Sequence, residues 1–267
     1  MKPAPFAYLR PQSVSAAVAA LAADPSAKVL AGGQSLVPLL SMRLASPSAL
    51  VDINGIPDLD GIDVTDGGVR IGALARHADV LADEKVRRVQ PLVSLALANV
   101  AHATIRNRGT TVGSLVHADA AAEMPVVLTL LGGSVDVTGP SGSRTIPADE
   151  LYVGPLETSL AHDEIATSAF FPALAPGARV AFDEIARRHG DYALVGAAAL
   201  VHGDSVRVGY VSVSDVPTVV DLSGIPAAEA GDAALEQLEP ADDIHATAAY
   251  RSQLVRVLTR RVIEAAA

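Results

Sequence analysis

Short apolar runs alternate with helical patterns through the first half of the chain, which favours an α/β arrangement there. Residues 13–23 carry apolar side chains at helical spacing, and Ser13 or Ser15 can cap the start of this helix. A helix is also predicted over 35–44, where Pro38 is tolerated because it lies in the first turn. Strands are predicted at 28–33, 49–53 and 68–75.

The pattern changes along the second half. Buried helices are predicted over 89–103 and 124–133, and the turn residues of 134–146 indicate a hairpin. Beyond Pro172–Pro176, alternating strands joined by a tight turn at His202–Asp204 predict an antiparallel sheet. Two Ala-rich helices follow, at 227–238 and 244–266. We therefore predict an α+β protein with a first domain over 1–174 and a second over 175–267.

The composition limits the class of protein. Half of the 267 residues are hydrophobic and 19% are charged, which is typical of a globular chain. The formal net charge of −10 argues against nucleic-acid binding. The chain has no cysteine, so it holds no disulfide, thiolate-ligated iron–sulfur cluster or Cys-type zinc site. The N-terminus lacks the apolar core of a signal peptide, and the apolar windows are too short for a membrane span, which predicts a soluble, cytoplasmic protein.

A first glycine motif, "AGGQS", joins a short strand to a short helix at 31–35. Consecutive glycines let a ligand approach the backbone, and a helix N-terminus presents free N–H groups, which suits a diphosphate. A plain tight turn is the alternative. A Walker P-loop is excluded because Gln34 and Ser35 stand where its lysine belongs, and the third glycine of a Rossmann motif is missing. Asp52 lies 20 positions beyond Gly32, so an NAD-type domain stays open.

A second motif, "GTTVGS" at 109–114, again places glycines and hydroxyl side chains between two apolar segments. Thr and Ser hydroxyls donate to phosphate oxygens alongside backbone amides. Two such loops folding together would form one extended anion site without a lysine. This combination suits a dinucleotide with a long diphosphate bridge.

The paired motifs "LAGGQSLVPLL" and "IRNRGTTVGSLVHADAAAEMP" make the chain resemble the FAD-binding medium subunits of the molybdenum hydroxylase family, among them that of aerobic carbon monoxide dehydrogenase. The segments "GALARHAD", "ELYVGPLETSLAHDEI", "ARRHGDYALV" and "YRSQLVRVLTRR" continue the resemblance over nearly the whole chain. It implies an FAD-binding domain of two α/β subdomains, followed by a C-terminal domain with a three-stranded antiparallel sheet and helices.

The resemblance also implies the residues around FAD, with no catalytic or metal-binding residue among them. They are Ala31, Gly32, Gly33, Gln34 and Ser35 in the first loop, Thr110, Thr111, Val112, Gly113 and Ser114 in the second, and Asp119, Glu123 and Tyr192 near the rest of the cofactor. The family usually has a double glycine where Val112 and Gly113 stand. A valine resists positive φ and adds bulk, so the sequence of the second loop departs from the family pattern at this position.

The function that the resemblance implies is electron transfer within an oxidoreductase. Substrate is oxidised at a molybdopterin centre on a large subunit, and electrons pass through iron–sulfur clusters on a small subunit to this FAD and then to an external acceptor. A dimer of heterotrimers is the implied assembly. The absence of cysteine fits this division of labour. A stand-alone NAD-dependent dehydrogenase and a scaffold subunit that is not catalytic are the alternatives.

Other polar clusters admit simpler interpretations. His117, Asp119 and Glu123 could suggest a metal site, but such His–acid clusters are usually structural. We expect His77 and His102 to satisfy local hydrogen bonds. The most concentrated basic groups are either a solvated rim or contacts to a partner or a diphosphate. These are Arg106, Arg108, Arg187 and Arg188.

Overall fold

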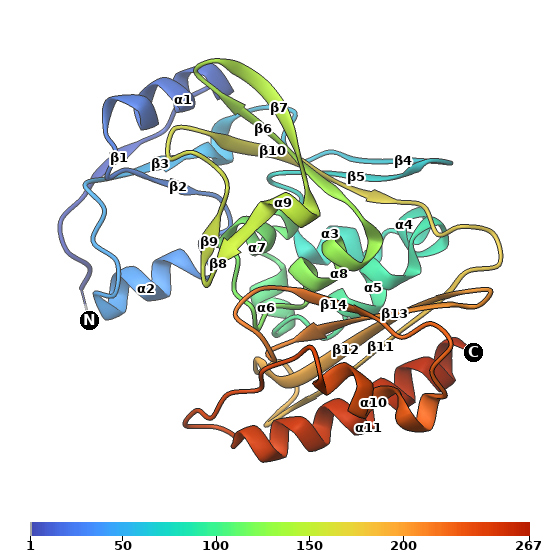
Figure 1. Cartoon of the computed structure of the whole chain (residues 1–267). Coiled ribbons are helices and arrows are strands. Elements are labelled where there is room, and N and C mark those ends of the chain that lie inside the picture. Colours follow the sequence, from blue (N-terminus) through green and yellow to red (C-terminus); the bar gives the residue numbers. More distant parts are fainter. Residues whose placement is uncertain (1) are drawn as a thin grey trace.

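The computed structural model describes residues 2–267, arranged in two small sheets, two larger sheets and the helices that cover them (Figure 1). The first subdomain is a three-stranded parallel sheet of order β1-β3-β2 with two helices. Its elements are β1 (Ala7–Leu9), α1 (Val14–Ala23), β2 (Lys28–Leu30), α2 (Leu36–Met42), β3 (Ala49–Asp52) and the 3-10 turn η1 (Ile53–Gly55). The Ser13 hydroxyl caps α1 by accepting from the amide of Ala16, as the sequence predicts.

The second subdomain is built on a five-stranded antiparallel sheet of order β4-β5-β10-β6-β7. These strands are Ile62–Thr65, Gly68–Gly72, Ile165–Pro172, Ser134–Gly139 and Gly142–Pro147, respectively. The helices are α3 (His77–Ala82), α4 (Glu84–Val89), α5 (Pro91–Leu97), α6 (Ala103–Arg106), α7 (Thr111–His117), α8 (Glu123–Leu131) and α9 (Ala148–Leu151), and the short strands β8 (Tyr152–Gly154) and β9 (Glu157–Thr158) pair with each other. The strand predicted at 68–75 therefore does not join the sheet of β2 and β3.

The C-terminal part contains four antiparallel strands, not the three that the resemblance implied. The strands are β11 (Arg179–Ala186), β12 (Ala193–His202), β13 (Ser205–Val211) and β14 (Thr218–Asp221), followed by α10 (Ala227–Leu235) and α11 (Ala248–Ala266). β14 is short, and a proline precedes it, but its backbone completes the edge of β13. The last helix begins at Ala248 rather than near Ile244, because Thr247 caps it.

The helix α8 joins the two larger parts of the molecule. It is apolar almost all round because one side packs against α5 and α7. Another side packs directly on β12, β13 and β14 of the C-terminal sheet. α10 and α11 cover the opposite face of that sheet, where a second hydrophobic core forms. The sheet is thus sandwiched between helices (Figure 1). No helix within residues 2–267 is long and apolar enough to cross a bilayer.

Gly209 on β13 allows the closest approach between α8 and the sheet. A Cβ built there would lie 2.6 Å from Val126 Cγ1. We expect Gly209→Ala to lower the free energy of unfolding by about 1–3 kcal/mol through overpacking. Gly61→Ala is the control, because its Cβ would meet nothing within 4 Å. Urea unfolding of both variants measures the difference, and equal stabilities would contradict this account of the contact.

Candidate functional site

The first glycine loop runs from the end of β2 to the start of α2, as the sequence predicts. Gly33 has a φ of 73°, which a side chain resists and glycine adopts freely. Ser35 occupies the N-cap position of α2, but its hydroxyl makes no capping hydrogen bond. Within residues 2–267, the amides of Gly33, Gln34 and Ser35 also donate to no protein acceptor. Strand, turn and helix therefore leave a row of free donors on a bare backbone.

The second glycine loop forms the entry to α7. Thr110 is the N-cap, and its hydroxyl accepts a hydrogen bond of 3.1 Å from the amide of Gly113. Val112 is not among the residues with positive φ; it lies in the first helical turn with its side chain buried in the core. The valine is therefore compatible with this loop, since the backbone here is helical. Ser114 follows within the same turn and its hydroxyl makes no hydrogen bond to the described chain.

The two loops touch each other through Gly32. A Cβ on Gly32 would lie 2.4 Å from the carbonyl oxygen of Arg108 and 2.8 Å from the Cα of Gly109. Only a residue without a side chain allows this approach. Segments almost 80 positions apart in the sequence are therefore in direct contact at this point. The donors present fit a diphosphate.

His77 binds the second loop through local hydrogen bonds, which agrees with the structural role expected for it. Its amide donates to the carbonyl of Gly109 (3.0 Å), and its Nδ1 lies 3.2 Å from the hydroxyl of Thr111. Burial, reinforced by the charge of Arg106, lowers the pKa of the His77 ring to about 4. The ring is therefore neutral near pH 7 and acts as a spacer.

Asp52 does not present a free carboxylate at the end of β3. One of its oxygens accepts from the backbone amide of Asn54 at 2.9 Å and from the Asn54 side chain at 2.6 Å. The other accepts from the hydroxyl of Tyr8. Since both oxygens are occupied by donors of this chain, the NAD alternative loses the residue on which it depends.

Comparison with known proteins identifies the family of the chain. The family described as the FAD binding domain in molybdopterin dehydrogenase matches residues 4–174, and the carbon monoxide dehydrogenase flavoprotein C-terminal domain matches residues 180–266. The chain belongs to this family. It is an FAD-binding medium subunit of a multi-subunit molybdenum hydroxylase, and so a component of an oxidoreductase. The alternatives of an NAD-dependent dehydrogenase and a scaffold are not favoured.

Individual relatives cover the chain from end to end. Subunit alpha of the 6-hydroxypseudooxynicotine dehydrogenase complex of Paenarthrobacter nicotinovorans is 40% identical over 98% of this chain and 95% of its own. Caffeine dehydrogenase subunit beta of Pseudomonas sp. strain CBB1 is 36% identical over 100% of this chain and 96% of its own. The solved structure of carbon monoxide dehydrogenase from Hydrogenophaga pseudoflava superimposes with a TM-score of 0.94 at 32% identity, covering 100% of this chain and 98% of that one.

Asp119, Glu123 and Tyr192 of this medium subunit form a second cluster beyond α7. Tyr192 lies just before β12 and is 60% exposed. Desolvation and then the charges of Asp119 and Glu123 raise the pKa of its hydroxyl. Glu123 is 6% exposed. Its burial and the charges of Glu184 and Asp119 raise its pKa to about 8.

The loop that carries Asp119 is fixed from both sides. The amide of Leu156 donates to the carbonyl of Ala118 (3.1 Å), and the amide of Ser212 donates to the carbonyl of Ala120 (2.8 Å). The second of these bonds comes from the C-terminal part. The loop that carries Asp119 is therefore held by contacts from both parts of the chain.

Three of the four arginines singled out in the sequence divide into two groups, and the fourth, Arg108, is an exposed residue. Arg106 donates to the carbonyls of Val100 and Ala101, so it is a structural residue. The exposed side chains of Arg187 and Arg188 both pair with Asp191. Exposed pairs of this kind contribute little stability.

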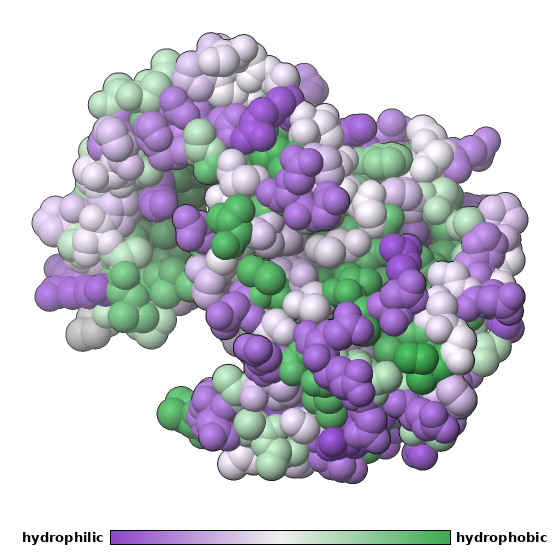
Figure 2. Space-filling view, in the orientation of Figure 1, coloured by the Kyte–Doolittle hydropathy of each residue, from purple (hydrophilic) through white to green (hydrophobic). Residues whose placement is uncertain are grey.

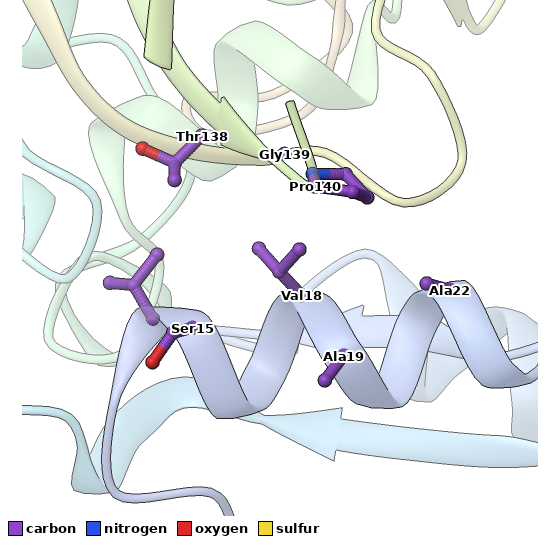
Figure 3. Close-up of a pocket in the computed structure, with 8 residues that line it drawn as sticks. Ser15, Val18, Ala19, Ala22, Thr138, Gly139 and Pro140 are labelled. Carbon is purple, nitrogen blue, oxygen red and sulfur yellow. The ribbon is translucent and has the colours of Figure 1, made fainter. Parts of the chain in front are cut away.

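A cavity of about 540 Å³ lies away from the glycine loops, between α1 and the β6–β7 turn (Figure 3). Its lining is Val14, Ser15, Val18, Ala19, Ala22, Thr138, Gly139 and Pro140. None of these side chains is charged, so this cavity offers nothing for a diphosphate. A different hollow appears in Figure 2, between the part that carries α2 and the C-terminal part, and α6 and α7 lie between these two parts in Figure 1. Within residues 2–267, no group of three His, Asp or Glu side chains could hold a metal ion.

Proposed function

We propose that the two glycine loops of this medium subunit bind the diphosphate of FAD. The contact of Gly32 with Arg108 and Gly109 carries this proposal, because it joins two sets of free donors into one site. The proposed FAD-binding residues are those of the two loops and the cluster beyond them. They are Ala31, Gly32, Gly33, Gln34, Ser35, Thr110, Thr111, Val112, Gly113, Ser114, Asp119, Glu123 and Tyr192.

The contribution of each group follows from its position. The amides of the first loop and the hydroxyls of Ser35 and Ser114 would donate to phosphate oxygens, while Tyr192 would lie against the flavin ring from the C-terminal part. Bound FAD supplies the redox chemistry, and the protein supplies binding, orientation and electrostatics. The domain division at 174 and 175 stays part of this proposal, supported by the second hydrophobic core of the C-terminal part.

The partners that we propose are an iron–sulfur small subunit and a molybdopterin large subunit, assembled as a dimer of heterotrimers. This chain has no cysteine with which to ligate clusters. Its relatives are named as subunits or medium chains, and the Hydrogenophaga pseudoflava structure is of a carbon monoxide dehydrogenase that lacks the Mo-pyranopterin moiety of its molybdenum cofactor. A cytoplasmic location is part of the same proposal.

The choice of substrate belongs, in this proposal, to the large subunit. Relatives of similar identity are named for 6-hydroxypseudooxynicotine, caffeine and carbon monoxide, which share no chemical group that one medium subunit could recognise. Electrons would reach this FAD from the clusters and leave to an external acceptor. Medium subunits of different complexes would then carry out the same electron transfer, although their surfaces would fit different partner chains.

We expect purification at native expression levels to yield a flavin-containing complex with a cluster-bearing and a molybdenum-bearing chain. Electron transfer requires close, fixed spacing of cofactors, which a stable assembly provides. The visible spectrum and the identity of the co-purified chains are the measurement. A homo-oligomer alone would contradict the proposed partners.

The isolated chain tests whether substrate oxidation belongs to the partner subunits. The isolated, FAD-loaded chain is expected to show no oxidation of the substrate that the complex oxidises. Substrate turnover by the chain without partners would contradict the proposal. Slow oxidation of NADH by the bound flavin would not contradict it, because the proposal assigns electron exchange between FAD and external molecules to this chain.

A further inference from the structure

Two carbonyl groups of the glycine loops are held from behind by side chains of neighbouring segments. Asn54 Nδ2 donates to the carbonyl of Ala31 at 2.8 Å. Arg76 Nη1 donates to the carbonyl of Arg108, also at 2.8 Å. Arg76 Nη2 donates to Asn54 Oδ1 at 2.8 Å, so the two supports form one bridge between the loops.

The carboxylate of Asp52 fixes the orientation of this bridge. It accepts from Asn54 Nδ2, which leaves Asn54 Oδ1 directed at Arg76. Partial burial raises the pKa of Asp52, but hydrogen bonds from Tyr8 and Asn54 outweigh it, so the net pKa is lowered. The carboxylate is therefore charged near neutral pH and acts as an acceptor only.

The bridge determines which groups of the loops face outward. In a trans peptide the C=O and N–H point in opposite directions, so holding the Ala31 carbonyl on Asn54 turns the Gly32 amide the other way. Within residues 2–267 that amide donates to no protein acceptor. On the second loop, Arg76 holds the Arg108 carbonyl, the oxygen that lies against Gly32. A guanidinium there offsets the negative end of a carbonyl dipole that would otherwise repel a diphosphate.

We propose that Asn54 and Arg76 are positioning residues for FAD, which hold the two glycine loops at the spacing and orientation that the diphosphate requires. Neither side chain contacts the cofactor in this proposal; both act through backbone carbonyls. The inference rests on the proposed FAD site. It assigns to Asp52 the role of orienting the Asn54 side chain.

The test is a double-mutant cycle of Asn54→Ala and Arg76→Met in the full chain, read as the dissociation constant of FAD. Each single variant is expected to bind FAD about 10- to 100-fold more weakly, because oriented donors to a charged group are lost. The double variant is expected to be no weaker than the worse single variant, since either change breaks the same bridge. The FAD affinity of Arg76→Lys is expected to lie between those of the parent and Arg76→Met, because one ammonium cannot hold two separated acceptors as a guanidinium does.

Two controls separate positioning from general stability. Asn99→Ala removes an amide that donates to the carbonyl of Leu95, and Arg70→Met removes a guanidinium that pairs with Asp136, both away from the loops. These variants are expected to bind FAD within about threefold of the parent. Circular dichroism and thermal unfolding report the fold of every variant. If a bridge variant fails to fold, Arg76→Lys gives the result.

The outcomes distinguish this inference from the proposed site. FAD affinity within threefold of the parent in both bridge variants, with Gly33→Asp still defective, overturns the inference and leaves the site. Additive losses in the double variant also overturn it. Normal FAD binding by Gly33→Asp removes the site itself, and the inference with it.

Discussion

Gly33→Asp is expected to abolish FAD binding or to weaken it by about 10²–10⁴ in the dissociation constant, while most of the fold remains. Gly33 has a φ of 73°, and a Cβ there would lie 3.1 Å from Leu30 Cδ1 and 3.2 Å from Val37 Cγ2. The added carboxylate repels the diphosphate and obstructs the free amides. Hydrogen bonds to charged groups contribute about 1.5–3 kcal/mol each, so losing two costs about 3–6 kcal/mol.

The matched control is Gly177→Asp. Gly177 has a φ of 80°, lies in an exposed turn, and its Cβ would meet nothing within 4 Å. It carries the same backbone strain and the same charge without the diphosphate. Flavin per folded chain is the measurement, with circular dichroism for the fold. Full FAD occupancy in a normally folded Gly33→Asp protein would show that "AGGQS" is not the phosphate cradle.

Glu123→Gln is expected to stabilise the flavin-free chain by about 3 kcal/mol at pH 7. Burial and the charge of Glu184 raise the pKa of Glu123 from 4.5 to about 8. The stability associated with the neutral form is complete below pH 4.5 and is lost as the pH rises through 8. Each pKa unit between the folded and unfolded chain costs about 1.4 kcal/mol of stability. At pH 7 the parent has lost most of this stability, whereas the uncharged amide of the variant loses none.

The pH dependence identifies the cause. At pH 5 the two proteins should differ by less than about 1 kcal/mol, because Glu123 is then mostly neutral in the folded chain and only partly ionised in the unfolded one. Glu150→Gln, on the exposed surface of α9, should not change the pH dependence. Urea unfolding between pH 5 and 8 gives the values. An unchanged difference across this range would rule out ionisation of Glu123 as the cause.

The local pattern predicted elements best where one segment decides them alone. α1 begins at its Ser13 cap, and the hairpin of β6 and β7 closes at its turn residues, because capping and turn chemistry act within a few positions. The hydrophobic pattern was less informative for elements that form only by pairing with another strand. β14 is a four-residue strand that pairs with β13 beyond a proline, and β5 joins β10 across about 100 positions. Strand pairing at that distance leaves no local signal.

The candidate site shows the same division. The glycines and hydroxyls of both loops are evident from residue type, since close approach and anion binding require bare backbone and small donors. The bridge of Asn54 and Arg76 had no sequence signal, because an Asn after a strand and an Arg before a helix are common. The spacing of Asp52 did direct attention to the right strand end, but its carboxylate binds this chain's own Asn54 and Tyr8.

The sequence by itself determined an α+β chain without cysteine that carries two glycine motifs suited to a diphosphate. Those properties follow from residue chemistry and local conformation, which act over a few positions. Only the tertiary structure decided that Gly32 meets Arg108, that Asn54 and Arg76 connect the loops, and that Tyr192 lies beside Asp119. These contacts join segments that the chain separates by 22 to 76 positions, and the packing of sheets and helices, not their local sequence, brings them together.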